Sequence, residues 1–359
     1  MSRYAALLAV SFSACSCPGS SPGGPDASQD VDAAFPPDAS TPACGDEDGL
    51  PARVTQAGAS VLLECDASSA VLAITTFEDG IVRLRYGADD RGSLVPLTRP
   101  AERAPLTGRR GASVVLCTSL LTLEAEPGTC RLSARLADGR VLLEDGDGGG
   151  WFAGRALATG ETTERDVVGV SRRAPPGERL YGLGLHTRAG SGLDLRGRTV
   201  ELYNTDAYDP GAGGFRPDAP MLYESIPFYL GLRAGAAYGV FTDNTHRTRF
   251  DLAATDLFRT TVTAWGGAID QWLVAGPALR DVVRRYTLLT GRMPLPPRWS
   301  LGFHLSRWEG PCDGSPADRP ISRWAWAKRV RESIINRTVF PLSRKYSAIV
   351  TAANAAFTR

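Results

Sequence analysis

The sequence predicts an all-β sandwich that ends in one helix, and three observations support this fold class. Apolar and polar residues alternate with period two through residues 61–144, as they do in half-buried strands. Turn dipeptides that contain glycine separate the alternating runs. Within the first 310 residues, only residues 277–289 show the apolar spacing of an amphipathic helix. Strands with one apolar face each are buried most simply by packing two sheets face to face.

The first 49 residues read as an export signal and a tether. Met1, Ser2 and Arg3 precede an apolar run that ends at Ala14, which is typical of a short secretory signal and too short to span a bilayer. Residues 12–15 are similar to a bacterial lipoprotein cleavage box, so we expect lipidation at Cys15, with plain secretion as the alternative. Segment 16–49 is rich in Pro, Ser, Asp and Ala and is expected to be flexible. The sequence therefore predicts an exported lipoprotein, touching the membrane only through its lipid, or otherwise a periplasmic or secreted protein.

The predicted sandwich domain covers residues 50–292. Alternation is clearest where Val82, Leu84 and Tyr86 are separated by arginines, and residues 131–136 repeat it with Leu and Ala against Arg and Ser. Asp-Gly pairs lie between such runs, where glycine adopts the positive φ that a tight turn requires. The Asp-Gly pairs and the later strand-like segments are residues 79–80, 138–139, 200–203, 228–232, 238–242 and 259–264.

One amphipathic helix is expected at residues 277–289, with Pro277 in its first turn. Apolar side chains recur there at intervals of three and four residues, which places them on one face of a helix. That face is expected to consist of Leu279, Val282, Val283, Tyr286 and Leu289.

Cysteine count and spacing leave the pairing open. Seven cysteines are present, and an exported protein is able to oxidise them. We expect Cys117 to pair with Cys130, because they bracket adjacent strand-like runs, and Cys44 to pair with Cys65. Reduced, buried thiols are the alternative.

Composition excludes several classes of function. The chain has 359 residues, 43% of them apolar and 22% charged, with a net charge of +1, which fits a soluble globular protein and gives no reason to expect nucleic acid as a partner. Both lysines, Lys328 and Lys345, fall after residue 310. We therefore expect residues 311–359 to be an atypical tail that is not native to the domain, with a genuine basic helix as the alternative.

Cofactor and metal motifs are not supported. The glycine-rich loop at 145–150 resembles a calcium loop, but Ala156 stands where the bidentate carboxylate would be needed. The first 327 residues contain no lysine for a phosphate loop, and the three histidines do not have the spacing of zinc ligands. We expect neither a cofactor nor a metal ion.

Four groups of residues carry a resemblance to a known family. Together they resemble glycoside hydrolase family 31, the α-glucosidase and α-xylosidase group, and shorter matches at 266–270, 276–277 and 286–292 extend the likeness. The four groups are Leu180-Tyr-Gly-Leu-Gly184, Leu202-Tyr-Asn-Thr-Asp206, Ile226-Pro-Phe-Tyr229 with Tyr238-Gly-Val-Phe-Thr-Asp-Asn244, and Pro296-Pro-Arg-Trp-Ser-Leu-Gly-Phe-His-Leu-Ser-Arg-Trp308.

The resemblance implies a galactose-mutarotase-like β-sandwich packed on a (β/α)8 barrel. Segment 293–310 would be the linker and the first barrel strand, at residues 299–306. In the family both catalytic carboxylates lie in the barrel, which needs about 250 residues, so we expect no catalytic residue in this chain. The expected protein is an N-terminal carbohydrate-binding fragment of a retaining α-glycosidase that does not hydrolyse substrate alone. The alternative is a stand-alone surface carbohydrate-binding or interaction module.

One substrate-binding residue is implied by the resemblance, Asp206. It aligns with an aspartate that the family's sandwich domain extends over the barrel mouth to bind sugar hydroxyls. A carboxylate suits this task because it accepts two charge-assisted hydrogen bonds. A turn aspartate that caps local amides is the alternative, and turn geometry explains Asn204 and Asn244 equally well. The expected partners are α-linked glucoside or xyloside oligosaccharides.

Overall fold

The computed structural model describes most of the chain between Cys44 and Leu301. Described residues up to Arg292 belong to one compact unit, and the few after it belong to a second. The described residues of the first unit form antiparallel strands and one α-helix, so the predicted all-β sandwich is confirmed. The described residues are 44–66, 70–87, 100–146, 149–185, 193–205, 208–209, 214–215 and 222–301.

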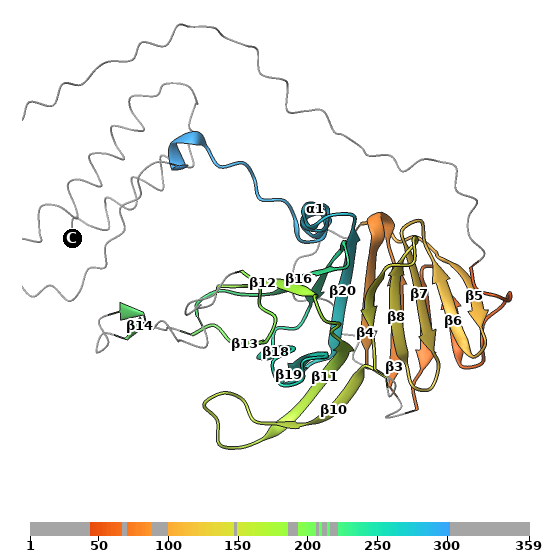
Figure 1. Cartoon of the computed structure of the whole chain (residues 1–359), viewed down its shortest axis with the longest axis horizontal. Coiled ribbons are helices and arrows are strands. Elements are labelled where there is room, and N and C mark those ends of the chain that lie inside the picture. The colour runs from red at the N-terminus through yellow and green to blue at the C-terminus, as the bar shows by residue number, and fades with distance from the viewer. Residues whose placement is uncertain are drawn as a thin grey trace, which may run out of the picture. The chain divides into compact units, whose positions relative to one another are not determined.

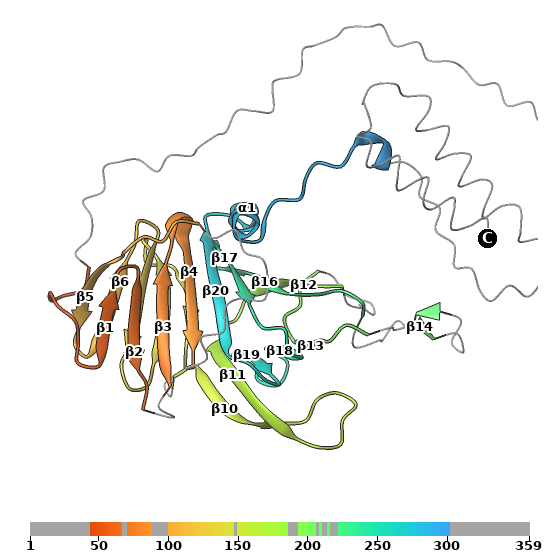
Figure 2. The same ribbon diagram turned by 180° about the vertical axis from the view of Figure 1, so that it is seen from behind.

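One layer of the sandwich is an eight-stranded sheet, visible from both sides in Figures 1 and 2. Strands from the beginning and the end of the domain's sequence are neighbours at the centre of this sheet, because β20 lies between β4 and β17. In spatial order the strands are β1 (Val54–Ala57), β2 (Ser60–Glu64), β3 (Val71–Thr76), β4 (Ile81–Tyr86), β20 (Ile269–Gly276), β17 (Ala236–Thr242), β16 (Ser225–Arg233) and β12 (Arg179–Gly184).

Two five-stranded sheets supply the opposing side, and apolar residues of all three sheets meet in one core. The first consists of β5 (Leu106–Arg110), β6 (Ser113–Cys117), β7 (Leu121–Glu126), β8 (Arg131–Leu136) and β9 (Val141–Glu144). The second consists of β10 (Trp151–Ala156), β11 (Arg165–Arg173), β19 (Arg259–Ala264), β18 (Thr248–Leu252) and β13 (Arg198–Leu202). A separate short ladder pairs β14 (Tyr208–Asp209) with β15 (Gly214–Phe215).

Alternation along the strands separates core from surface as predicted. Val82, Leu84 and Tyr86 are fully buried, whereas the two arginines between them are half-buried on the other face of β4. Successive side chains of a strand point to opposite faces, so this pattern buries one face of β4 against the core. Both Asp-Gly pairs lie between paired strands with their glycines at positive φ, as predicted, at 68° for Gly80 and 88° for Gly139. The first pair lies in the short 3-10 helix η1 (Glu78–Gly80).

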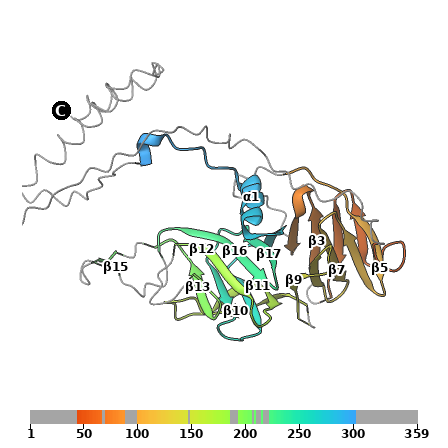
Figure 3. The same cartoon turned by 45° about the horizontal axis from the view of Figure 1, so that its top comes forward.

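The predicted helix is present as α1 (Leu279–Thr290), which covers the outer face of the eight-stranded sheet (Figure 3). The Tyr286 ring stacks on Phe228 with 3.8 Å between centroids. Two details of the prediction were wrong. Val283 is 42% exposed, and Arg285 is buried instead because its Nη1 donates to the Ala275 carbonyl at 2.5 Å. Pro277 lies before the N-cap residue and outside the first turn.

Both predicted disulfides were paired wrongly. Cys44 bonds to Cys117 and Cys65 bonds to Cys130, with Cα–Cα distances of 5.7 and 5.4 Å. The register explains why Cys117 and Cys130 do not meet: Cys117 lies opposite Thr122, and Cys130 precedes the partner of Glu126. These positions are about 13 Å apart along β7, beyond the reach of a disulfide.

Two predicted boundaries also differ from the structure. Residues 44–49, expected in the flexible tether, begin with a disulfide-bonded cysteine, and Arg109 exchanges backbone hydrogen bonds with Glu47 at 2.9 and 3.2 Å. Residues 299–301, expected to start a barrel strand, lie in the 3-10 helix η3 (Arg298–Leu301). The rest of that strand, the tail 311–359 and Cys15 lie outside the described residues. Within the described part, no helix has the length and apolar character to cross a bilayer.

A buried polar network joins the layers at the centre of the domain. Asp145, the residue after β9, and Arg172 on β11 form an isolated antiparallel bridge, and they are 1% and 3% exposed. The Arg172 Nε lies 3.4 Å from the Asp145 Oδ1, and its Nη1 donates to the Gln271 Oε1 at 2.6 Å. The Asp145 Oδ2 accepts the Leu132 amide at 3.0 Å. This network places a charged pair inside the apolar core, where either member alone is costly.

The buried carboxyl predicts a dependence of stability on pH. Burial raises the pKa of Asp145 from 3.8 to about 6, against the opposing charge of Arg172 and the hydrogen bond from Leu132. Because the folded state holds this proton more tightly, its stabilising contribution is complete below the unfolded pKa and is lost as pH rises through the folded one. The unfolding free energy of the wild type, relative to Asp145→Asn, should fall by up to about 3 kcal/mol across this window. Urea unfolding at a series of pH values measures the difference, and parallel profiles for the two proteins would contradict it.

Candidate functional site

The predicted sugar-binding residue, Asp206, lies outside the described residues, but both ends of its loop are described. The loop leaves β13 and returns to β16. At its base the Thr205 amide donates to the Leu222 carbonyl at 3.1 Å. The Leu185 amide, just after β12, donates to the Glu224 carbonyl at 3.0 Å. Asp206 therefore follows a base at which β12, β13 and β16 are tied together by backbone hydrogen bonds.

A charged group on the sheet adjoins this base. Glu201 on β13 lies opposite Arg249 on β18, whose Nη2 donates to its Oε2 at 2.8 Å. Arg247 donates to the other carboxylate oxygen, and the Thr159 hydroxyl donates to Oε2 at 2.7 Å. Burial by itself would raise the pKa of Glu201, but the hydrogen bonds from Thr159 and Arg249 and the two arginine charges outweigh it, so the pKa lies below its ordinary value. Glu201 is thus an ionised anchor for both arginines.

Two aromatic rings complete the group. The Arg247 guanidinium lies 5.0 Å from the ring centroid of Tyr203, and the Arg249 guanidinium lies 4.9 Å from that of Trp265. Tyr203 is 53% exposed, three residues before Asp206. A guanidinium over an aromatic face is an attractive contact that restrains both groups. We name this set, Glu201, Tyr203, Arg247, Arg249 and Trp265, the Arg247 cluster.

Sequence reasoning missed the Arg247 cluster. Arg247 and Arg249 flank Thr248 in an alternating pattern that reads equally well as the solvated face of a strand. The one acidic residue of β13, Glu201, was the sequence feature that indicated a partner for these arginines. Only the register of β13 against β18 places Glu201 beside Arg249. Opposite charges that face each other across two strands stabilise the pairing.

Asn244 has a structural role. Its Nδ2 donates to the carbonyls of Gly266 and Ala268 at 2.9 and 3.0 Å, and its Oδ1 accepts the His246 amide at 2.8 Å. These bonds hold the loop after β17 against the loop before β20. The turn explanation therefore accounts for Asn244 without a sugar contact. Across the described ranges no group of three or more His, Cys, Asp or Glu side chains is arranged to hold a metal ion.

The chain is similar to a known protein family and to several of its members. Residues 71–251 match the model of the glycosyl hydrolase 31 N-terminal galactose mutarotase-like domain. Alpha-glucosidase 2 of Bacillus thermoamyloliquefaciens is 34% identical over 251 residues, which cover 68% of this chain and 29% of that protein. Alpha-xylosidase XylQ of Lactiplantibacillus pentosus is 32% identical over 129 residues, 36% of this chain and 15% of that protein.

Solved structures show the same fold. The Flavobacterium johnsoniae family 31 dextranase in complex with glucose superposes with a TM-score of 0.58 and 20% identity, over 72% of this chain and 30% of that one. The chain thus spans less than a third of the length of each of these relatives. The family match covers half of the chain, from the first residue of β3 to the residue before the end of β18. The chain belongs to glycoside hydrolase family 31, and the matched region is the N-terminal galactose-mutarotase-like sandwich of that family.

Proposed function

We propose that this chain forms the N-terminal, substrate-contacting part of a family 31 α-glycosidase, and that Asp206 contacts hydroxyl groups of an α-linked glucoside or xyloside. The observation that carries the proposal is the family match over residues 71–251, which includes the loop of Asp206. The relatives named alpha-glucosidase and alpha-xylosidase support these two substrate classes.

The base of the loop fits this role. A residue that selects a substrate must be held by rigid elements, and the base is tied to three strands. The Arg247 cluster stiffens the same end of β13 through a buried carboxylate and two ring contacts. Asp206 would then accept two hydroxyl hydrogen bonds, while bond cleavage depends on a pair of carboxyl groups outside the matched region.

Assays on the purified chain test the proposal. We expect no release of nitrophenol from p-nitrophenyl α-glucoside or α-xyloside. Turnover by pure protein would contradict the proposal that cleavage of the glycosidic bond depends on carboxyl groups outside the matched region. Isothermal titration with maltose and xylosides separates the alternatives. Saccharide binding that disappears in Asp206→Ala would favour the stand-alone binding module instead.

Asp206→Ala is expected to leave folding almost unchanged. Substitutions of polar loop residues usually change the unfolding free energy by about 0.5 kcal/mol or less. Asn244→Ala is the matched control, because it removes three hydrogen bonds from a half-buried turn and should cost roughly 1–3 kcal/mol. Thermal unfolding followed by circular dichroism compares the two. A large drop in the melting temperature of Asp206→Ala would show that Asp206 caps backbone amides of the fold and does not bind sugar.

We also propose that the protein is exported and anchored through lipid at Cys15. Two disulfides among the described cysteines support an oxidising compartment. Cys15→Ser should move the protein from the membrane to the soluble fraction, because lipid chains supply the only anchor proposed. Detergent partitioning and mass measurement of the mature N-terminus test this. An unmodified Cys15 in the mature protein would refute lipidation and leave plain secretion.

A further inference from the structure

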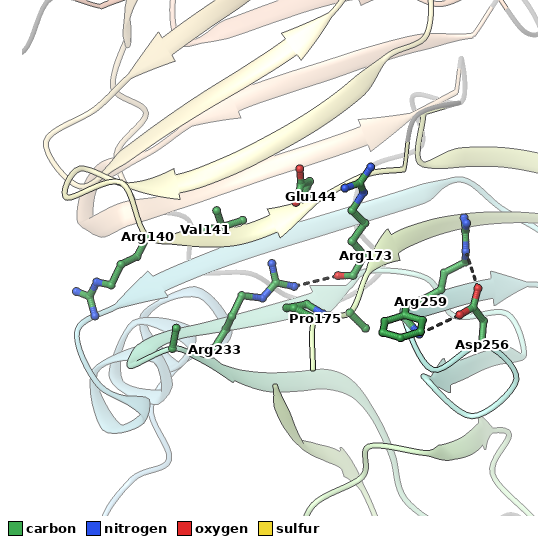
Figure 4. Close-up of a pocket in the computed structure, with 11 residues that line it drawn as sticks. Arg140, Val141, Glu144, Arg173, Pro175, Arg233, Asp256 and Arg259 are labelled. Atoms are coloured by element: carbon green, nitrogen blue, oxygen red, sulfur yellow. Dashed lines mark hydrogen bonds and ion pairs between the residues drawn. The ribbon is translucent and has the colours of Figure 1, made fainter. Parts of the chain in front are cut away.

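A cavity of about 650 Å³ opens where the two five-stranded sheets part (Figure 4). Its walls come from β9, the end of β11, the turn between β16 and β17, and the turn before β19. Volumes of this size are typical of small-molecule sites. The cavity lies at the Arg233 end of β16, whereas the Asp206 loop joins the Ser225 end, so about 26 Å of strand separates them.

We propose that this cavity binds a neutral saccharide, as a carbohydrate site separate from the Asp206 loop. The inference goes beyond the proposed function, because it requires neither Asp206 nor the Arg247 cluster. Three features carry it: a fixed buried donor, a mixture of acids and arginines, and an exposed aromatic ring.

The fixed donor is Arg233, whose side chain is only 9% exposed. Its Nε donates to the Glu178 Oε1 at 2.9 Å, and its Nη2 donates to the Arg173 carbonyl at 2.9 Å. The Arg173 bond is drawn in Figure 4. The same Glu178 oxygen accepts the Tyr238 hydroxyl at 2.7 Å, which holds the carboxylate in place. No bond of the Arg233 Nη1 is found among the described residues, so this nitrogen remains available to a ligand in the cavity that Arg233 lines.

The charges around the cavity favour a ligand that both donates and accepts. Arg140, Arg173 and Arg259 line it together with Arg233, but so do the carboxylates of Glu144 and Asp256. An anion would meet two carboxylates, and a cation would meet four guanidinium groups. Hydroxyl groups donate to the acids and accept from the arginines, so a polyhydroxylated neutral molecule satisfies both kinds of group.

The aromatic ring is that of Phe258, which is 63% exposed. Two hydrogen bonds fix the backbone of this residue. Its carbonyl accepts the Ala174 amide at 2.7 Å, and its amide donates to the Asp256 Oδ1 at 2.9 Å. With the half-buried Pro175 it supplies an apolar wall. A pyranose ring presents C–H groups on one face and hydroxyls at its edge, so it matches an apolar wall beside a polar rim.

The test is titration of the full chain with maltotriose, isomaltotriose and xylobiose at millimolar concentrations, followed by ligand-observed NMR and calorimetry. Phe258→Ala should weaken binding about tenfold, because it removes the apolar face. Leu257→Ala is the matched control, since Leu257 is equally exposed at 66% but does not line the cavity. We expect Leu257→Ala to bind like the wild type.

Three outcomes would overturn the proposal. The first is the absence of saccharide binding, and the second is equal binding by Phe258→Ala and the wild type. The third is stronger binding of glucuronate or inorganic sulfate than of any neutral sugar, which would assign the arginines to an anion. The second outcome, together with loss of binding in Asp206→Ala, would place the sugar at the loop instead of the cavity.

Discussion

Changing Cys65 and Cys130 together to alanine should lower the free energy of unfolding by about 4 kcal/mol. The bond closes a loop of 65 residues, and cross-linking a loop of this length restricts the unfolded chain by about that amount. Both cysteines are buried, at 8% and 2% exposure, so alanine avoids the unpaired hydroxyl that serine would introduce. Chemical denaturation of the oxidised variant and wild type measures the difference.

Two controls separate the pairing from a general effect of reduction. The double variant retains the Cys44–Cys117 bond, so its remaining stability should fall further when reductant is added. Peptide mapping under non-reducing conditions identifies the connectivity directly. Recovery of a peptide that links Cys117 to Cys130 would contradict the structure, and a loss well below 1 kcal/mol would contradict the role of the bond.

Arg172→Met should destabilise the fold by about 3–5 kcal/mol, because it leaves the Asp145 carboxyl buried without its cation. It also removes the donor to Gln271, a residue with no exposed surface on β20. Methionine fills most of the arginine stem, so the effect reports the charge more than a cavity. Urea unfolding near neutral pH, where Asp145 is ionised in the wild type, gives the largest difference.

Variants of neighbouring residues make this prediction specific. Arg173→Met changes the next residue, which is exposed, and should alter stability by no more than about 0.5 kcal/mol. The double change Asp145→Asn with Arg172→Met removes both charges and should recover part of the loss. If the double variant is as unstable as the sum of the single variants, the two residues do not act as a pair.

Local patterns in the sequence were sufficient for the strands and the helix. Alternation in β4 and β8 depends only on neighbouring residues, because each strand buries one face. The helix α1 was found from its spacing, but Val283 was misplaced because apolar character alone does not decide a residue at the edge of the buried face. Arg285 is buried there because the carbonyl of Ala275 on β20 accepts its guanidinium, a partner that spacing does not reveal.

Contacts between distant segments could not be predicted in this way. Cys65 meets Cys130, and Glu201 meets Arg249, only because of the register of strands that are 48 to 65 residues apart. A change of one residue in register would move each side chain to the opposite face. The same limit applies to the loop of Asp206, whose position was implied by family resemblance while its tied base is visible only in three dimensions.

By itself the sequence determined the sandwich class, the helix α1 and the family, since alternation, helical spacing and short residue runs are local properties of the chain. Tertiary structure alone decided the two disulfides, the Asp145–Arg172 pair, the Arg247 cluster and the cavity beside Arg233. The physical reason is that β20 pairs with β4 and β17 in the eight-stranded sheet. The core and its charged residues therefore come from segments at both ends of the domain's sequence. Such pairings depend on register and packing, which no short window of residues contains.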